Sequence, residues 1–514
     1  MKAKDSLVLI FLVMGLSSSL MVKAQPQSLP APDHPQLSIF TEQQQFVWLD
    51  DLTLTAQAED ALSFIKAATI HGLDPEDYHF SLLQKLSQQP TIELARYFDT
   101  LLTDAMLDLI HDLAIGRLDP AQTDPTWFIP RDKVNPAEEL QKALLNPYIK
   151  NVLNKLLPSL PQYHQLTLFL SQYRGYQLRG GWQTVPTMPL LRPGDSHQHV
   201  PFLRARLITE NPSLNLIEAE QTTIYDGQLV ETVKQFQARH GLKIDGIVGS
   251  ETRAALNQSV DDLITKIRVN LERFRWLPDD LGKRYLLVNL GSHQLTAVED
   301  GQIKLNMKVI VGKSQRATPS FNSAMTHLVI NPYWNVPHKL ARRDLLPKQQ
   351  ADPDYFFLNE FNLFLRNAEV RTPVDPYRID WDEVSALSSE FPYRLQQRPG
   401  ELNALGRLKF MFPNPWNIYL HDTPDKALFS KNQRNFSSGC IRVEDPLALG
   451  QFSLNENNAQ SWLQSQIDSG QNRGRKLETP LPVYAVYFTI WSDQGEVRFS
   501  PDPYGRDSTI AKRL

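Results

Sequence analysis

The sequence predicts a multidomain α+β fold: a helical N-terminal scaffold, a small three-helix module and a mostly-β C-terminal domain with a long insertion. Three observations support this prediction. The chain has 514 residues, which is too long for one hydrophobic core. Apolar residues recur at three- and four-residue steps before residue 258, as in helices. After residue 283 they alternate with a period of two, as in strands.

The first 24 residues have the pattern of a secretory signal peptide. Lys2 and Lys4 precede an apolar run from Leu7 to Val22, and Val22 and Ala24 stand at the positions that a signal peptidase reads. The run has about 16 residues, whereas roughly 20 are needed to span a bilayer. We therefore expect residues 1–24 to direct export and to be removed, with an uncleaved membrane anchor as the alternative.

Residues 25–182 are predicted to form a helical scaffold without catalytic chemistry. Segments 58–75 and 97–120 repeat apolar side chains with the helical period, and both end in a glycine followed by Asp-Pro. Glycine and proline are the residues expected at and just beyond the end of a helix.

Residues 183–258 are predicted to form a compact three-helix module. Val233 and Phe236 fall on the buried face of one helix, and a glycine-bounded turn leads into the next. The segment resembles the small peptidoglycan-binding module, whose signature matches Phe236, Gln237, Gly241, Leu242, Asp245, Gly246 and Gly249. A three-helix spacer without a ligand is the alternative. His197 and His199 have no third ligand nearby in the sequence, so we predict a polar loop there instead of a metal site.

A linker helix is predicted at 259–282, a mostly-β domain at 283–500 and a C-terminal tail at 501–514. Residues 284–312 alternate apolar and polar side chains around a hairpin turn at 299–301. Strand character returns after residue 405 and again near the C-terminus, where two segments rich in β-branched and aromatic residues are expected to complete the sheet.

Residues 333–405 interrupt this domain. They are rich in proline, arginine and aspartate, so we predict little regular structure there. Connections of this length are commonly lids or binding insertions, and we expect a lid. The insertion has a basic edge formed by His338, Lys339, Arg342 and Arg343. This edge suits the carboxylates of a ligand, but a charged loop that only contacts solvent is an equal alternative.

Cys440 is the only cysteine, so the chain cannot form an internal disulfide. A lone cysteine is most often a small buried apolar residue, but in an exported protein it is also a candidate reactive thiol. The serines and glycine before it and the arginine after it make a poor core segment. His421 is a candidate base, because strand alternation puts it on one face with Tyr419, opposite Ile418 and Leu420.

The residues around Cys440 favour exposure of its sulfur. Gly439 permits a sharp turn and a close approach of the backbone to a substrate. Asp445-Pro446 is a typical start for a helix. We therefore expect the sulfur on a turn whose backbone N–H groups converge as in an oxyanion hole. Arg442 should share the face of Cys440, where it could hold a carboxylate or favour the thiolate.

The segments "IYLHDT" and "FSSGCIRVEDP" resemble the active-site motif of the L,D-transpeptidases. The match covers His421, Ser438, Gly439, Cys440 and Arg442. The stretches "INPYWNVP" and "PGELNALGRLKFMFPNPWNIYLHD" are similar to the long periplasmic members from Gram-negative bacteria. Many members have histidine where this chain has Ser438. No acidic residue is identifiable as a partner for His421, so the group that orients its ring stays open, with a backbone carbonyl as one candidate.

The resemblance implies a periplasmic enzyme of cell-wall biogenesis and cell shape, with a thiol that accepts carbapenems. Cys440 is implied to attack the diaminopimelate carbonyl of a donor tetrapeptide stem, with His421 as proton acceptor and donor. The amine of an acceptor stem then resolves the thioester as a 3→3 cross-link. Contacts to the oxyanion and substrate are implied for Gly439, Tyr419, Ser438 and Arg442.

The implied partners are donor and acceptor peptidoglycan stems, and other cell-wall synthesis proteins are further candidates. No cofactor, metal or nucleic acid is expected, since 53 basic residues nearly balance 57 acidic ones. An L,D-carboxypeptidase or another cysteine hydrolase would need the same residues, and a non-catalytic wall-binding protein is a third class. The sequence leaves these three alternatives open. It also does not determine whether the acceptor is a stem or a lipoprotein amine, or whether the module binds glycan. The resting position of the lid and the oligomeric state are likewise open.

Overall fold

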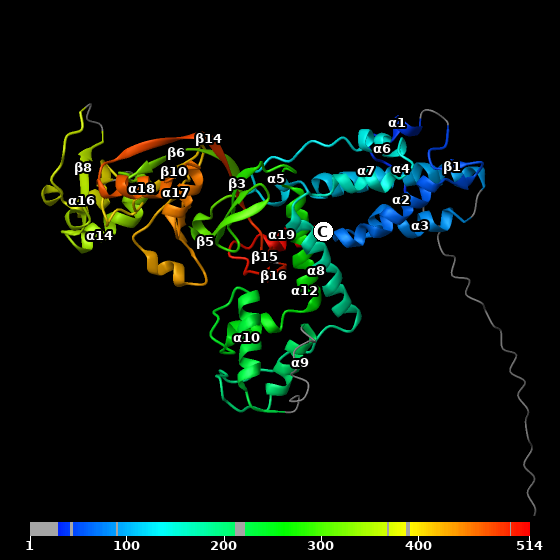
Figure 1. The fold of residues 1–514 in the computed structure, drawn as a ribbon, viewed down its shortest axis with the longest axis horizontal. Coiled ribbons are helices and arrows are strands. Elements are labelled where there is room, and N and C mark those ends of the chain that lie inside the picture. Colours follow the sequence, from blue (N-terminus) through cyan, green and yellow to red (C-terminus); the bar gives the residue numbers. More distant parts are fainter. Residues whose placement is uncertain are drawn as a thin grey trace, which may run out of the picture.

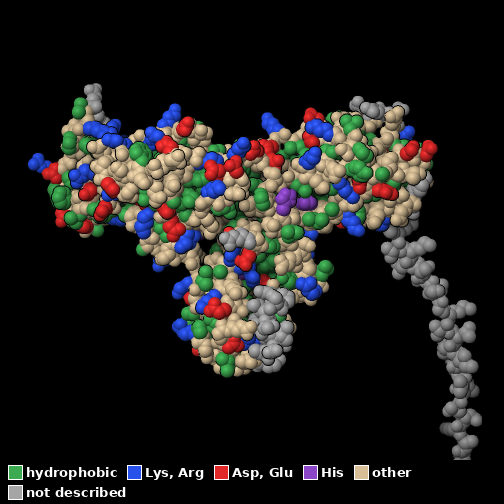
Figure 2. Space-filling model, viewed as in Figure 1, with side chains coloured by type: hydrophobic (Ala, Val, Ile, Leu, Met, Phe, Trp, Pro, Cys, Tyr) green, Lys and Arg blue, Asp and Glu red, His purple; other side chains and the backbone are tan. Residues whose placement is uncertain are grey.

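The computed structural model describes residues 29–41, 45–88, 91–210, 222–366, 370–386, 391–493 and 495–514. The predicted signal peptide, residues 1–24, lies outside the described residues. Three arms meet near the centre of the molecule: the scaffold helices, the β domain with its insertion, and the three-helix module (Figure 1). Acidic and basic side chains are interspersed over the described part of the visible face (Figure 2). No helix in the described ranges has the length and apolarity needed to cross a membrane.

The scaffold is helical, as predicted. It consists of α1 (Ser38–Thr41), β1 (Leu49–Asp50), β2 (Thr53–Leu54), α2 (Ala56–Ala67), η1 (Ala68–His71), η2 (Pro75–Tyr78), α3 (Phe80–Leu86), α4 (Ile92–Ile115), α5 (Pro120–Thr123), α6 (Pro136–Leu144), α7 (Ile149–Leu153), η3 (Asn154–Leu156) and α8 (Pro161–Leu178). The helical run 56–71 ends at Gly72 and α4 ends at Gly116, and both glycines have positive φ, which residues with a Cβ rarely adopt.

The three-helix module is also confirmed, as α9 (Val200–Glu210), α10 (Gly227–Arg239) and α11 (Ser250–Leu256). Its signature residues hold the turn between α10 and α11. The Gln237 side chain accepts a hydrogen bond from the Gly246 N–H and donates one to the Ile247 carbonyl, and Gly246 has a φ of 69°. These residues therefore have a structural role, whether or not the module binds glycan.

The helix expected to be a linker is α12 (Val260–Arg275), and it is a central packing element instead. It packs against α8, and its Glu272 side chain is fully buried and accepts hydrogen bonds from the Leu118 N–H and the Arg275 guanidinium. The expected C-terminal tail contains α19 (Asp507–Ala511), which contacts α12, and Asp507 pairs with Arg273 at 2.5 Å. A helix is therefore present within the predicted 259–282, but its packing and that of the C-terminal segment were not predicted.

The β domain is built on a sheet with the strand order β12-β5-β13-β11-β10-β6-β14-β3-β4. Because β4 also pairs with β5, the sheet closes on itself as a barrel. Its strands are β3 (Arg284–Asn289), β4 (Gln294–Glu299), β5 (Gln302–Gly312), β6 (Phe321–Ile330), β10 (Leu408–Met411), β11 (Leu420–His421), β12 (Asn435–Ser437), β13 (Ile441–Val443) and β14 (Arg473–Val486). The predicted hairpin turn is confirmed, with positive φ at Asp300 and Gly301.

The remaining elements of the β domain cover the sheet or connect its strands. They are η5 (Ser314–Arg316), η8 (Lys426–Ser430), α17 (Pro446–Leu454), α18 (Ala459–Asp468), β15 (Ile490–Asp493) and β16 (Glu496–Phe499). The expected helix start after the cysteine is confirmed, since Asp445 accepts a hydrogen bond from the Ala448 N–H. β15 and β16 form a separate two-stranded hairpin, so only β14 of the two C-terminal strand segments joins the main sheet as predicted.

The insertion at 333–405 is a small folded subdomain, which corrects the prediction of little regular structure. It contains β7 (Trp334–Asn335), α13 (His338–Leu340), the π-helical turn η6 (Ala341–Leu345), α14 (Leu346–Ala351), α15 (Tyr355–Leu358), β8 (Phe361–Leu365), η7 (Pro376–Arg378), α16 (Trp381–Ala386) and β9 (Tyr393–Gln397). Phe356, Trp381 and Phe391 lie in its own apolar core. Its elements are too short for their hydrophobic periods to be legible in the sequence.

Candidate active site

Cys440 immediately precedes β13, and the pairing of β13 with β11 decides which side chains share its face. The two strands are parallel, with Leu420 opposite Ile441 and His421 opposite Arg442. Leu420 and Ile441 are fully buried in the barrel core, as strand alternation predicted for Leu420. Alternation therefore places His421, Arg442 and Cys440 on the opposite face.

Tyr419 lies directly beside Cys440. The Ile441 N–H donates to the Tyr419 carbonyl at 3.1 Å, which sets Tyr419 next to Cys440 across the two strands. The hydroxyl of Tyr419 and its backbone N–H both form hydrogen bonds with the sulfur of Cys440. The ring of Tyr419 also contacts the ring of His421 edge-on, with 5.6 Å between the centroids. His421 lies opposite Arg442, so it is a diagonal neighbour of Cys440 on this face.

His421 is held as a neutral imidazole with a defined tautomer. It is 4% exposed, and its Nδ1 lies 2.5 Å from the carbonyl oxygen of Asp422. Burial, together with the positive charges of Arg442 and Lys409, lowers the pKa of His421 to about 3. Because Nδ1 donates to a carbonyl, Nε2 is the unprotonated nitrogen, as a general base requires. The group that orients His421, which the sequence left open, is thus the backbone carbonyl of Asp422.

Cys440 is also held in its neutral form. Burial raises the pKa of its thiol, while hydrogen bonds from Tyr419 and the charges of Lys409 and Arg442 oppose this increase. The sulfur is 3.9 Å from the carbonyl oxygen of Asn417, which therefore accepts a weak hydrogen bond from the thiol. The resting pair is thus thiol and imidazole, with positive charge nearby to stabilise a thiolate when the proton leaves.

The backbone before Cys440 adopts the turn that Gly439 was predicted to permit. Gly439 has a φ of 121°, where a side chain would be strained. Its N–H donates to Ser437 Oγ at 3.1 Å, and its carbonyl accepts from Thr318 Oγ1 at 2.9 Å. The Cys440 N–H, by contrast, has no hydrogen-bond acceptor within the described part of the chain. Of the two N–H groups, the one of Cys440 is available to an oxyanion.

Ser438 and Arg442 lie on either side of Cys440 in the sequence and form contacts with neighbouring segments. Ser438 Oγ accepts a hydrogen bond from the Arg316 guanidinium at 2.7 Å, so it faces the insertion. Arg442 pairs with Asp425 at 3.0 Å. Arg442 acts on the sulfur through its charge, since it contributes to lowering the pKa of the thiol.

The insertion is connected to the loop that carries Cys440 through Arg316. The Arg316 guanidinium donates to both carboxylate oxygens of Asp344, in η6 of the insertion, at 2.8 and 3.0 Å. Burial raises the pKa of Asp344, but hydrogen bonds from Arg316 and Arg343 outweigh this effect and lower the pKa overall. One guanidinium thus joins Asp344 to Ser438, and hence the insertion to the turn of the nucleophile.

A cavity of about 320 Å³ is lined in part by Asn417, whose carbonyl contacts the sulfur, and by Tyr419. Its lining residues are Thr326, His327, Lys409, Met411, Phe412, Pro413, Asn414, Asn417, Ile418 and Tyr419. Trp416, from the same loop as Asn417, packs at a tilt against Phe128 of the scaffold, with 4.7 Å between ring centroids. The scaffold therefore supports one wall of the cavity.

Lys409 is a functional candidate that the sequence reading missed. It pairs across the sheet with His421, so it lies on the same face as the thiol. Its ammonium is 3.8 Å from the centre of the Tyr419 ring, and no carboxylate of a described residue pairs with it. Strand alternation in "GRLKFMF" would have placed Lys409 opposite the buried Leu408 and Phe410.

The residues of this site show no metal-binding arrangement. Among the described ranges no group of three or more His, Cys, Asp or Glu side chains could hold a metal ion. His197 and His199 have their rings 4.9 Å apart, and His199 Nδ1 contacts the Thr187 carbonyl. The chemistry available at the site is therefore that of a thiol, an imidazole and hydrogen-bond donors.

Comparison with known families assigns three regions of the chain. Residues 283–460 match the L,D-transpeptidase catalytic domain, residues 196–256 match a "Putative peptidoglycan binding domain", and residues 40–170 match a scaffold domain. The chain is 36% identical over 253 residues to a "Putative L,D-transpeptidase" of Haemophilus influenzae. That match covers 48% of this chain and 49% of the relative, so the chain spans about half of the relative's length.

Similar solved structures include two L,D-transpeptidases. One, from Mycobacterium smegmatis, has 14% identity and a TM-score of 0.20, with 40% of this chain and 58% of that chain covered. The other, from Stackebrandtia nassauensis, has 13% identity and a TM-score of 0.22, with 59% and 96% covered. On the family matches, the chain carries an L,D-transpeptidase catalytic domain and a peptidoglycan-binding domain.

Proposed function

We propose that the protein is an exported peptidoglycan L,D-transpeptidase that forms 3→3 cross-links between tetrapeptide stems through a thioester on Cys440. The observation that carries this proposal is the shared face of Cys440, Tyr419 and His421, where the sulfur accepts hydrogen bonds from Tyr419 and the imidazole is neutral. The match of residues 283–460 to an L,D-transpeptidase catalytic domain supports the reaction class.

In the first half-reaction the sulfur of Cys440 attacks the diaminopimelate carbonyl that precedes the terminal D-alanine. The thiol proton passes to Nε2 of His421 as the S–C bond forms. The oxyanion is stabilised by the free N–H of Cys440 and by the hydroxyl of Tyr419. His421 then donates its proton to the leaving nitrogen, the C–N bond breaks, and D-alanine departs.

In the second half-reaction the side-chain amine of an acceptor stem attacks the thioester. His421 accepts a proton from the attacking nitrogen and returns it to the departing sulfur, which regenerates the thiol and the neutral imidazole. The burial of His421 supports this role, because a base with a pKa of about 3 releases its proton readily to the sulfur. Lys409 and Arg442 stabilise the thiolate while it is the leaving group.

The other regions of the chain fit a substrate that is part of the cell wall. The match of residues 196–256 to a peptidoglycan-binding domain supports peptidoglycan as the partner. The N-terminal 24 residues favour export to the periplasm, where such an enzyme would contribute to wall biogenesis and cell shape. Carbapenems, which contain a strained carbonyl, are expected to acylate the same thiol.

The proposal is tested by incubating the full chain and its Cys440→Ala variant with purified tetrapeptide muropeptides and measuring product masses. A cross-linked dimer and released D-alanine are expected from the wild type only. Tripeptide without dimer would instead assign an L,D-carboxypeptidase. Unchanged muropeptides with retained binding would assign a non-catalytic wall-binding protein. Dimer formation by the Cys440→Ala variant would refute the role of the thiol.

A further inference from the structure

The insertion carries a second cavity, of about 430 Å³, beside its small sheet. The sheet has the order β7-β9-β8, with Gln396 opposite both Asn335 and Asn362, and Arg394 opposite Phe364. Leu363 and Leu395 alternate with these residues and pack in the apolar core of the insertion, and Leu395 also lines the cavity. Polar and apolar side chains of the sheet therefore both line the cavity.

Three arginines from different segments line this cavity. Arg394 belongs to β9, Arg366 follows β8, and Arg371 comes from the segment after it. None of the described lining residues is acidic. The guanidinium groups of Arg371 and Arg394 form no hydrogen bond or ion pair with any residue in the described ranges, and both side chains are exposed to solvent. Arg371 and Arg394 therefore bring to the cavity two positive charges that no described residue neutralises, in a nearly neutral protein.

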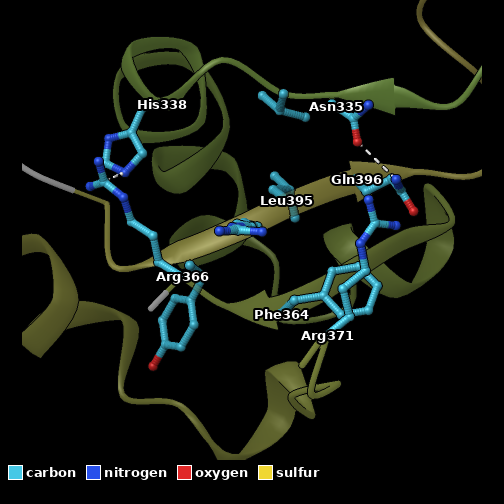
Figure 3. A pocket seen from close by; sticks show the side chains of 10 residues that line it. Asn335, His338, Phe364, Arg366, Arg371, Leu395 and Gln396 are labelled. Atoms are coloured by element: carbon cyan, nitrogen blue, oxygen red, sulfur yellow. Dashed lines mark hydrogen bonds between the residues drawn. The ribbon is translucent and has the colours of Figure 1, made fainter. Parts of the chain in front are cut away.

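The charges are distributed at two ends of the cavity. Figure 3 shows Arg366 beside His338 at one end, and Arg371 beside Gln396 at the other. The Arg366 guanidinium is 2.9 Å from His338 Nε2, and Gln396 donates to Asn335 at 2.8 Å. Phe364, whose ring centre is 5.9 Å from the Arg371 guanidinium, supplies apolar surface. A fitting ligand has at least two separated anionic groups on a backbone with apolar parts.

We propose that this cavity binds a peptide through two of its carboxylates, and that the peptide is a peptidoglycan stem. Guanidinium groups bind carboxylates with paired, charge-assisted hydrogen bonds. A stem tetrapeptide combines several free carboxylates with alanine methyl groups. The identity of the ligand rests on the proposed function, because peptidoglycan must be the material on which the protein acts.

The contacts between the insertion and the loop of Cys440 give stem binding in the cavity a role in the reaction. His338 lines the cavity and begins the helical run that contains Asp344. Because a helix rises about 1.5 Å per residue, His338 and Asp344 lie on the order of 9 Å apart along this run. Asp344 is joined through Arg316 to Ser438, two residues from Cys440. The insertion that carries the cavity is therefore joined to the turn of the nucleophile, and the second stem held there serves as an acceptor or belongs to a neighbouring strand.

The test measures binding of a purified disaccharide-tetrapeptide by calorimetry to the full chain carrying Cys440→Ala, which prevents acylation. On this background we expect Arg371→Gln with Arg394→Gln to weaken binding at least tenfold, since each charged hydrogen bond contributes roughly a factor of ten. Arg378→Gln is the matched control, because Arg378 is an exposed arginine of the same insertion that does not line the cavity. It should leave the dissociation constant within about twofold of the background.

A muropeptide with its carboxylates amidated should bind the background protein as weakly as the free acid binds the double variant. Equal dissociation constants for the background and the double variant would overturn the proposal. Acylation of the wild type by the same muropeptide reports the proposed function separately. Acylation without arginine-dependent binding would refute only the proposed stem binding in the cavity. Arginine-dependent binding without acylation would refute only the proposed transpeptidase reaction.

Discussion

Cys440, the single cysteine of the chain, keeps its thiol protonated in the resting protein. Burial raises the pKa of the thiol, and the neighbouring imidazole of His421 is neutral because burial and nearby cations lower its pKa to about 3. A thiol in this state reacts slowly with adventitious oxidants. It becomes nucleophilic only when a carbonyl is in place and the proton can move to His421.

This arrangement predicts the pH dependence of thiol reactivity. The pKa of His421 lies near 3, so its protonation state does not change between pH 5 and 8. We expect the rate of Cys440 alkylation by iodoacetamide to increase with pH to beyond 9, without an inflection near 6.5. The single cysteine makes the measurement unambiguous by intact mass. A plateau beginning near pH 6.5 would indicate a thiolate–imidazolium pair and contradict the geometry.

Lys409 gives a second prediction at the same scale. Its charge lowers the pKa of the thiol and no described acid neutralises it, so Lys409→Met should raise that pKa by up to one unit. Alkylation at pH 8 should slow about three- to tenfold, and Lys409→Arg should recover most of the rate. Lys476→Met, an exposed lysine of β14, is the control. Equal rates for Lys409→Met and the wild type would remove Lys409 from the site.

The sequence was informative for residues whose role follows from strand alternation. It placed Tyr419 and His421 together, and it identified Gly439 as the turn before the nucleophile. It could not reveal that Arg316 contacts Ser438, because these residues are 122 positions apart and meet only through the pairing of β5 with β12 and β13. The dyad itself remains a prediction until chemistry is measured.

At the scale of elements, the pair between Arg316 and Asp344 is the contact that joins the insertion to the nucleophile's turn. Both side chains are partly exposed, so the pair is expected to contribute only about 0.2–1 kcal/mol to stability. Its importance is positional, because it holds η6 over the turn that ends at Cys440. We propose that an insertion held there restricts the access of water to the thioester.

We therefore predict that Asp344→Asn shifts the fate of the acyl-enzyme from transfer towards hydrolysis. The ratio of dimer to tripeptide should fall by up to about fivefold, because a partly exposed pair contributes about 0.2–1 kcal/mol when intact. The melting temperature should change little. Asp375→Asn, which breaks an exposed pair with Arg378 on the same insertion, is the control and should leave the ratio unchanged. An unchanged ratio in Asp344→Asn would show that this contact does not govern water access.

Element prediction succeeded for long periodic segments and failed for short or central ones. The scaffold helices and the first hairpin have clear periods and clear stop signals. The insertion builds a core from short pieces between prolines, so no period is long enough to read. α12 was misjudged as a linker because its polar residues, such as Glu272, are satisfied by partners distant in the sequence.

At the scale of the whole molecule, buried contacts join the three arms. Several histidines are also buried in their neutral form. The three-helix module docks through His240, whose ring stacks between Phe236 and Phe499 at 4.0 and 4.7 Å. The scaffold reaches the active-site cavity through Phe128. The order of the domains was predictable from the sequence, but their docking was not, because each interface joins residues from separate domains.

The buried histidines predict a loss of stability in mild acid. Burial, aided by neighbouring cations, lowers the pKa of His71 to about 4 and that of His293 and His421 to about 3. Between these values and 6.5 the unfolded chain binds more protons than the folded one, so stability decreases as the pH falls below 6.5. Each group contributes about 1.4 kcal/mol per pH unit in that interval.

Thermal unfolding followed between pH 7 and 4.5 should therefore show a steep decrease of the midpoint below pH 6.5. His293→Gln, outside the active site, should reduce the slope by the contribution of one group even if it lowers the midpoint overall. A midpoint that is constant down to pH 5 would contradict the neutral burial of these histidines.

The most direct test of the proposed chemistry is intact-protein mass spectrometry of the full chain after brief exposure to a tetrapeptide muropeptide. The account predicts an adduct equal to the muropeptide minus D-alanine, located on Cys440 by peptide mapping, and strongly reduced in His421→Ala. An adduct on another residue, or an adduct that forms equally fast without the imidazole, would contradict it.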